Sequence, residues 1–261
     1  MDLVSLHDKS EIEQFLRTNV YLHLYGIGDL DDFFWSQTIW YGGRTGEGIA
    51  AVALLYLAPS VPTLVALSEQ TGAMRDLLES LRGILPGRFY AHLSPGLETV
   101  FQGSHDVRPH GAHYKMALRD ASRLDGVECP GVVRLGEADL GEILEFYEAS
   151  YPDTWFDPRM LQTNEYFGLR DGNDLVSVAG IHVYSPRYRV AALGNVATHP
   201  SFRNRGYARR VTARLCRSLG GEVDHIGLNV KSDNAAALRC YKSLGFEVVA
   251  SYGEFAIEGR R

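Results

Sequence analysis

Between residues 190 and 219, apolar positions change from the continuous run of a buried strand to the spacing of a helix face. Residues 190–193 and 196–198 favour β-structure, and Pro200 ends this strand. The residues that then recur at helical spacing are Ala208, Val211, Thr212, Leu215 and Leu219. The pattern predicts a strand that leads through a turn at 203–208 into a helix, whose free amide N–H groups would suit a phosphate.

The same reading predicts the elements around this stretch. In chain order they are a strand at 132–135, a helix at about 137–150, strands at 166–170, 175–184 and 226–230, and a helix at 234–244. Gly194 and Asn195 interrupt the β-favouring residues of the strand at 190–198. The sequence therefore predicts a β-bulge at these two residues.

The first half of the chain repeats this order of elements. Strands are expected at 49–57, 63–67, 88–93 and 113–118, with a helix that begins after residue 67 and a short helical stretch at 97–101. Residues 120–130 contain Asp125-Gly126 and Pro130 and are expected to form a linker. The predicted architecture is therefore α/β (α+β), with two tandem domains at residues 1–125 and 126–261.

Two motifs in the second half resemble a known family. Arg203-x-x-Gly206-x-Ala208 follows a strand, and a later block reads Asn234-Ala235-Ala236-Ala237, then Tyr241, then Leu244-Gly245-Phe246. Both blocks, in this order, resemble the GNAT N-acetyltransferase superfamily over roughly residues 131–258. The resemblance implies two GNAT-like domains, each a mixed, mostly antiparallel sheet flanked by helices. The N-terminal domain is expected to be degenerate, because residues 68–73 lack the motif and place Glu69 where phosphates would lie.

The resemblance also implies the cofactor site, which would bind acetyl-CoA or another acyl-CoA. Backbone groups of Val196, Ala197 and Thr198 would pair with the pantetheine arm, and Asn234 would hydrogen-bond to it. The turn would hold the pyrophosphate through Arg203, Asn204, Arg205, Gly206, Tyr207 and Ala208. Tyr241 is the expected catalytic residue, as a general acid at the departing sulfur, although a hydrogen bond to the thiolate would serve nearly as well.

The acceptor side is less sharply indicated. Tyr151 and Trp155 lie in a segment with two prolines that either lines the acceptor site or plugs the space between helices. Asn229 is a further expected acceptor residue, at a position where some relatives that acetylate protein N-termini carry a glutamate. The general base is left open among four residues: Glu165, Asp153, His182 and Tyr184.

Composition restricts the possible partners. The chain of 261 residues has a formal charge of −6, yet the segment 200–221 contains six arginines and no acid. A cationic segment on an acidic protein favours a compact polyanion such as CoA over nucleic acid. Cys129, Cys216 and Cys240 have no C-x-x-C spacing, and the histidines of residues 105–113 are expected in an exposed loop, so no metal site is predicted.

These observations together predict an N-acyltransferase that moves an acyl group from acyl-CoA to the amine of a small molecule or peptide. The expected acyl group is acetyl, and it is not an aminoacyl group. The apolar run at 49–58 is too short to cross a bilayer, so no membrane partner and a cytoplasmic location are expected. The alternatives are a catalytically silent CoA sensor or scaffold and a nucleic-acid-binding protein. The acceptor, the acyl chain length, the oligomeric state and any ligand of the N-terminal half stay open.

Overall fold

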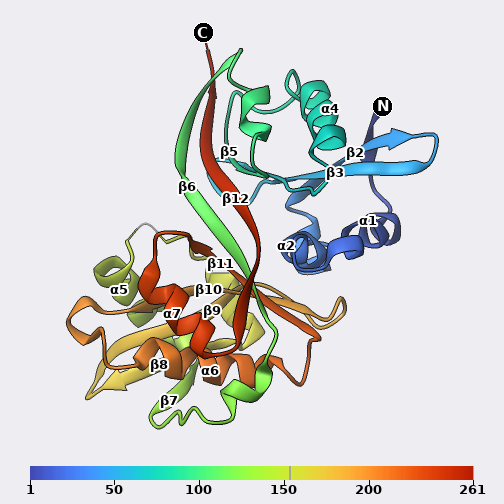
Figure 1. Cartoon of the computed structure of the whole chain (residues 1–261). Helices are drawn as coiled ribbons and strands as arrows, with labels where there is room; N and C mark the ends of the chain where they lie inside the picture. The colour runs from blue at the N-terminus through green and yellow to red at the C-terminus, as the bar shows by residue number, and fades with distance from the viewer. Residues whose placement is uncertain (153, 261) are drawn as a thin grey trace. The chain divides into compact units, whose positions relative to one another are not determined.

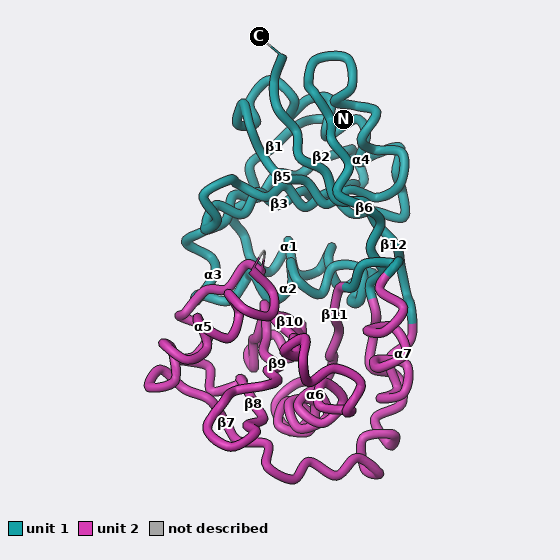
Figure 2. Tube along the Cα trace, turned by 90° about the vertical axis from the view of Figure 1, so that its left-hand side faces the viewer, with its two compact units in different colours: residues 1–115, 230–233, 248–261 teal, residues 116–229, 234–247 magenta. Residues whose placement is uncertain are grey.

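The computed structural model describes residues 1–152 and 154–260, which form two compact units (Figure 1). Unit 1 consists of Met1–Lys115, Val230–Asp233 and Val248–Arg261 (Figure 2). Unit 2 consists of Met116–Asn229 and Asn234–Glu247. Both units are mixed α/β structures, as the sequence predicts.

Unit 1 contains a sheet with helices against it. Its elements are β1 (Asp2–Leu6), α1 (Lys9–Leu16), α2 (Leu24–Asp29), α3 (Asp32–Trp35), β2 (Thr38–Thr45), β3 (Gly48–Tyr56), β4 (Thr63–Ala66), α4 (Thr71–Leu81), β5 (Arg88–Leu93), most of β6 (His105–Leu118) and most of β12 (Phe246–Gly259). The strands from β1 to β4 pair antiparallel in chain order, whereas β4 and β5 are parallel and α4 connects them.

Unit 2 repeats this arrangement. Its elements are β7 (Val132–Leu135), α5 (Leu140–Ser150), β8 (Tyr166–Asp171), β9 (Asp174–Ser185), β10 (Val190–Thr198), α6 (Tyr207–Leu219), most of β11 (His225–Lys231) and α7 (Ala235–Ser243). The strands from β7 to β10 pair antiparallel in chain order, and β10 and β11 are parallel with α6 as their connection. The shared pattern of three antiparallel pairs and one parallel pair confirms the predicted tandem arrangement.

The last strand of the chain, β12, belongs mostly to unit 1 and not to unit 2. Phe255 of β12 pairs antiparallel with Ala91 of β5, and residues 248–261 belong to unit 1. The expected domain boundary between Asp125 and Gly126 therefore does not coincide with the division into compact units. Backbone hydrogen bonds, which local sequence patterns do not encode, decide where this strand lies.

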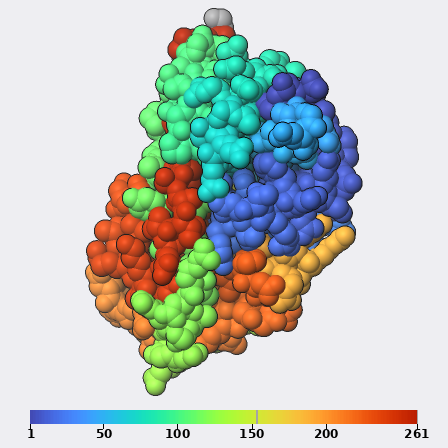
Figure 3. Space-filling view, turned by 45° about the vertical axis from the view of Figure 1, so that its right-hand side comes forward, coloured from blue at the N-terminus to red at the C-terminus, as the bar shows by residue number. Residues whose placement is uncertain are grey.

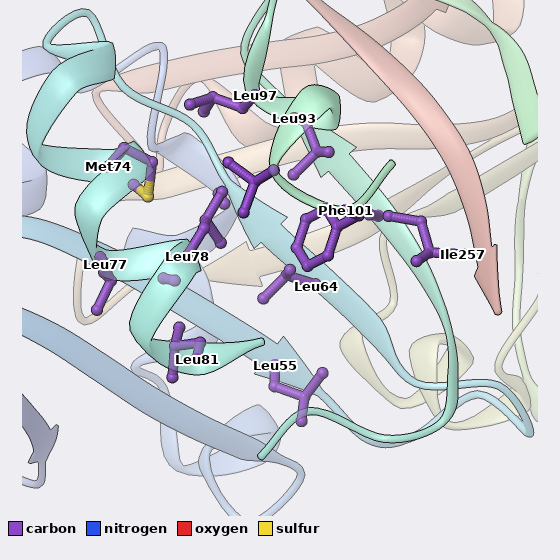
Figure 4. Packing of buried hydrophobic residues seen from close by; sticks show 14 of the residues in the cluster. Leu55, Leu64, Met74, Leu77, Leu78, Leu81, Leu93, Leu97, Phe101 and Ile257 are labelled. Atoms are coloured by element: carbon purple, nitrogen blue, oxygen red, sulfur yellow. The ribbon is translucent and has the colours of Figure 1, made fainter. Parts of the chain in front are cut away.

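A hydrophobic cluster lies between α4 and the sheet of unit 1 (Figure 4). Met74, Leu77, Leu78 and Leu81 form the buried stripe of α4, as their helical spacing predicts. The opposite face of α4 is exposed, and it forms part of the turquoise surface in Figure 3. Among the helices of the described residues, none has both the length and the apolar character that a bilayer crossing requires.

The sequence also predicts a helix capped by Ser10 and a turn at residues 26–29, and both of these local predictions for unit 1 are wrong. The cap of α1 is Asp8, whose carboxylate accepts from the backbone N–H groups of Ser10 and Glu11, and not Ser10 itself. The expected turn at 26–29 is the second half of helix α2. A short polar residue before a helix competes with its neighbours for the cap, and only the backbone angles decide between them.

The expected exposed loop with three histidines is also wrong. Residues 105–113 belong to β6, and His105 and His113 are buried. The imidazole Nε2 atoms of His113 and His92 each lie 3.5 Å from the carboxylate of Glu254 in β12. The same carboxylate accepts hydrogen bonds from the hydroxyl groups of Tyr90 and Tyr252. Long-range partners therefore bury polar residues that the local sequence places at the surface.

We expect Leu78→Ala to lower the free energy of unfolding by about 2–5 kcal/mol, because it leaves a cavity in the cluster below α4. Leu78 is fully buried, whereas Leu57 is 39% exposed. The matched variant Leu57→Ala should change stability by only about 0.5 kcal/mol. Denaturant titration measures both values, and equal losses would contradict the assignment of the core.

We expect His23 to make the protein less stable in acid. Burial, assisted by the positive charge of Lys115, lowers the pKa of His23 to about 4. Between pH 6.5 and pH 4 the unfolded chain therefore binds a proton that folded His23 does not, and stability falls with pH by at most about 3 kcal/mol. Unfolding measured at pH 7 and pH 4.5 should show a smaller loss for His23→Gln than for the native chain. The control His7→Gln, at an exposed position, should retain the native loss.

Candidate active site

The predicted break in β10 is present at Gly194 and Asn195. The register between β9 and β10 shifts at Ala192/Leu193 and again between Gly194 and Ala197. Asn195 has a φ of 54°, in the left-handed region that asparagine tolerates better than most residues. The prediction of a bulge is confirmed.

Asn195 is buried and forms hydrogen bonds to four side chains of unit 2. Its Oδ1 lies 2.9 Å from His182 Nε2 and accepts from the Thr154 hydroxyl at 3.0 Å. Its Nδ2 donates to the Tyr166 hydroxyl at 3.0 Å, and its backbone carbonyl accepts from the Tyr147 hydroxyl at 2.8 Å. The bulge is thus fixed to α5, to the segment after α5, to β8 and to β9.

Glycine makes room for the aromatic rings around the bulge. A Cβ atom on Gly194 would lie 2.1 Å from His182 Cδ2, and one on Gly180 would lie 2.1 Å from Tyr166 Cε1. Any larger residue at either position would displace the ring. The rings of Trp155 and His182 meet edge to face, with 5.9 Å between centroids and an interplanar angle of 77°.

Beyond the bulge, β10 continues past its parallel pairing with β11. That pairing joins Val190–Leu193 to His225–Leu228. Val196, Ala197 and Thr198 follow on β10, and Asn229 follows on β11. On the side of β9, the Ser177 hydroxyl donates to the Ala197 carbonyl. The last residue pair between β10 and β11 is Leu193 with Leu228. The predicted arm-binding residues on β10 and the predicted acceptor residue Asn229 on β11 therefore all lie beyond this pair.

The predicted pyrophosphate loop lies between β10 and α6. Asn204 and Gly206 both have left-handed backbone angles, with φ of 64° and 77°. Gly206 is the N-cap of α6 and has no side chain that could occupy the first amide N–H groups. Arg203 donates to the Thr198 carbonyl, and Arg205 lies over the Phe202 ring. The loop thus presents backbone donors and two arginines at a helix N-terminus.

The arginines of the segment 200–221 divide into two groups. Arg203 and Arg205 are exposed beside Gly206. Arg214 instead lies over the Phe167 ring, and Arg217 is partly buried, with hydrogen bonds to the carbonyls of residues 124 and 127. Of these four arginines, two therefore belong to the loop, whereas the other two contact residues outside it.

Helix α7 carries the two remaining predicted residues. The Oδ1 of Asn234 accepts from the Ala237 N–H at 3.1 Å, so Asn234 is the cap of α7. This bond uses only the amide oxygen, and the amide nitrogen is the atom that could donate to a cofactor. Tyr241 is buried at 8% exposure, and its ring packs against Phe246.

The segment after α5 has features of both alternatives that its sequence left open. Phe156 packs between Tyr147 and Tyr166, as a hydrophobic plug would. Tyr151 and Trp155 are 45% and 36% exposed, as acceptor-binding residues would be. The sequence identifies these aromatic residues but not the hydrogen bond between Thr154 and Asn195. The motif Gly194-Asn195 predicts a bulge, but it does not indicate which side chains would bond to it.

Comparison with known proteins identifies the family of this part of the chain. The profile of the acetyltransferase (GNAT) family matches residues 136–246. The N-alpha-acetyltransferase RimI of Mycobacterium tuberculosis (strain ATCC 25618 / H37Rv) is 37% identical over 90 residues, which are 33% of this chain and 54% of RimI. The chain thus matches about half the length of this relative.

Solved structures extend the similarity to the whole fold. An X-ray structure of a Drosophila protein has a TM-score of 0.74 at 16% identity and covers 98% of both chains. A tandem GNAT protein from the clavulanic acid biosynthesis pathway has a TM-score of 0.60 at 17% identity, over 100% of this chain and 99% of its own. Residues 136–246 therefore match the acetyltransferase (GNAT) family model, within a chain that has the fold of a tandem GNAT protein.

Proposed function

We propose that the protein is an acyl-CoA-dependent N-acyltransferase whose cofactor site lies in unit 2. The observation that supports this most directly is the loop before α6. Asn204 and Gly206 have left-handed backbone angles, and the N-terminus of α6 has no side-chain cap. Arg203 and Arg205 lie in the same loop. A pyrophosphate needs this combination of amide donors and positive charge. Tyr207 and Ala208 form the first turn of α6 and complete the loop.

The groups around β10 fit the remainder of an acyl-CoA. An extended arm that lies along Val196, Ala197 and Thr198 would use the strand edge beyond the pairing with β11, and the amide nitrogen of Asn234 would donate to it. When bound, the acyl-CoA supplies a thioester carbonyl that an amine can attack directly. A backbone N–H of β10 beside the bulge would stabilise the developing oxyanion.

Tyr241 is the proposed general acid. Its hydroxyl would donate a proton, or a hydrogen bond, to the departing thiolate. On the other side, the exposed rings of Tyr151 and Trp155 and the amide of Asn229 would contact the acceptor. The relative RimI is named an N-alpha-acetyltransferase, which agrees with an amine acceptor and with acetyl as the acyl group. Acetyl-CoA with a panel of amines and peptides tests this proposal, because a CoA sensor would bind it without releasing thiol.

We expect one acyl-CoA site per chain and a loss of affinity in Arg205→Glu. The turn before α4 carries Glu69, whereas the loop before α6 carries two arginines. Charge-assisted hydrogen bonds contribute about 1.5–3 kcal/mol each, so the variant should bind acetyl-CoA at least about tenfold more weakly. Calorimetric titration measures both stoichiometry and affinity. Arg187→Glu, an exposed charge reversal in the turn between β9 and β10, should bind normally, and two sites per native chain would contradict the proposal.

We expect Tyr241→Phe to lower kcat by about 10²–10⁴, because the ring and its packing against Phe246 stay while the hydroxyl is lost. Acetyl-CoA affinity and thermal stability should change little. Tyr188→Phe removes the hydroxyl of another buried tyrosine and should leave kcat near its native value. Steady-state kinetics with the best amine of the panel compare the three proteins, and a native kcat in Tyr241→Phe would make Tyr241 a packing residue.

A further inference from the structure

The four candidates for the general base have different environments. Asp153 lies outside the described residues. Glu165 is buried, forms an ion pair with Arg134 and accepts from the Ser218 hydroxyl of α6. Burial raises the pKa of Tyr184, and the charge of Glu165 reinforces this, so Tyr184 holds its proton at neutral pH. Of the described candidates, His182 is the one whose ring lies on the bulge of β10.

The hydrogen bonds around Asn195 determine which atom of its side-chain amide faces His182. Burial raises the pKa of Tyr166, so its hydroxyl is protonated, and this hydroxyl donates to the Ile181 carbonyl at 3.0 Å. Having donated its one hydrogen, the Tyr166 hydroxyl can only accept from Asn195. Nδ2 of Asn195 therefore faces Tyr166, and Oδ1 faces His182.

The orientation of Asn195 in turn determines the tautomer of His182. Because Oδ1 is an acceptor only, the hydrogen of the neutral imidazole lies on Nε2, at 2.9 Å from Oδ1. The basic lone pair of the neutral ring is then on Nδ1. The close approach of Gly194 and the edge-to-face contact with Trp155 restrict the position of the ring.

We infer that His182 is the general base of the transfer, and that Asn195 is a positioning residue that holds it in the Nε2–H tautomer with Nδ1 as the proton acceptor. This inference rests on the proposed function. It assigns a catalytic task to the strand bulge. Trp155, proposed to contact the acceptor, lies against the same ring.

The proposed step balances as follows. An acceptor that arrives as an ammonium ion loses one proton to Nδ1 of His182, which passes it to water. The resulting amine forms a C–N bond to the thioester carbonyl carbon, the C–S bond breaks and the electron pair leaves with sulfur. The second nitrogen proton is lost to Nδ1, and the thiolate takes a proton from the Tyr241 hydroxyl or from water. The imidazolium then releases its proton to water, and a phenolate at Tyr241 takes one back. The net products are the amide, the free thiol and one proton.

Nuclear magnetic resonance of protein labelled with ¹⁵N-histidine tests the tautomer without any assay of activity. The ring nitrogens of His182 are assigned by their absence in His182→Gln. In the native protein we expect the Nε2–H pattern at neutral pH, and in Asn195→Ala a mixture of tautomers. A native Nδ1–H tautomer would overturn the inference.

Kinetics test the catalytic role. His182→Gln should lower kcat by about 10²–10⁴ while its affinity for acetyl-CoA stays within about twofold of native. Asn195→Asp places a carboxylate beside the imidazole, which favours the imidazolium, so the acidic limb of the kcat/KM profile should move to higher pH by about one unit or more. Tyr184→Phe, two residues along β9, should leave both quantities unchanged.

These outcomes separate the inference from the proposed function. A native kcat in His182→Gln, or an unmoved acidic limb in Asn195→Asp, would overturn the role of His182 while the transferase remains. If the native chain acylates none of the amines, the proposed function fails. The nitrogen spectra and the titration of His182 in Asn195→Asp would then decide whether Asn195 determines the tautomer of the His182 ring.

Discussion

The buried amide of Asn195 is the interaction on which the site depends. A non-glycine residue in the left-handed region costs about 1–2 kcal/mol, and a break in a strand also leaves backbone groups to be satisfied. Four hydrogen bonds, from or to Tyr147, Thr154, Tyr166 and His182, offset this cost at about 0.5–1.5 kcal/mol each. The bulge is therefore a stable feature, and it places the imidazole of His182 beside β10, beyond the pairs that join β10 to β11.

The two units show how one topology supports different chemistry. In both, the first four strands pair antiparallel in chain order, and the fourth and fifth strands are parallel and connected by a helix. In unit 2 the connection begins with Gly206 and two arginines, whereas in unit 1 the helix begins after Glu69. The proposed function therefore depends on the residues at one turn and not on the arrangement of strands.

Unit 1 uses its polar residues for a different purpose. The carboxylate of Glu254 is held by two tyrosine hydroxyl groups and two imidazole rings, and these interactions keep the pKa of Glu254 below its usual value against the effect of burial. The ammonium group of Lys115 lies over the rings of Tyr25 and Tyr252. Such a network is costly to bury unless its members satisfy one another, so it specifies the packing of β5, β6 and β12.

The sequence by itself determined the elements with strong periodicity, the repeat, the bulge at Gly194-Asn195 and the phosphate-type loop at Arg203–Ala208, because spacing, glycine and proline act locally. It could not determine that β12 pairs with β5, that His113 is buried beside Glu254, or that Asn195 faces His182. Those outcomes depend on hydrogen bonds between residues far apart in the chain, for which several partners are locally equivalent. Only the tertiary structure, by burying each polar group against one partner, decided among them.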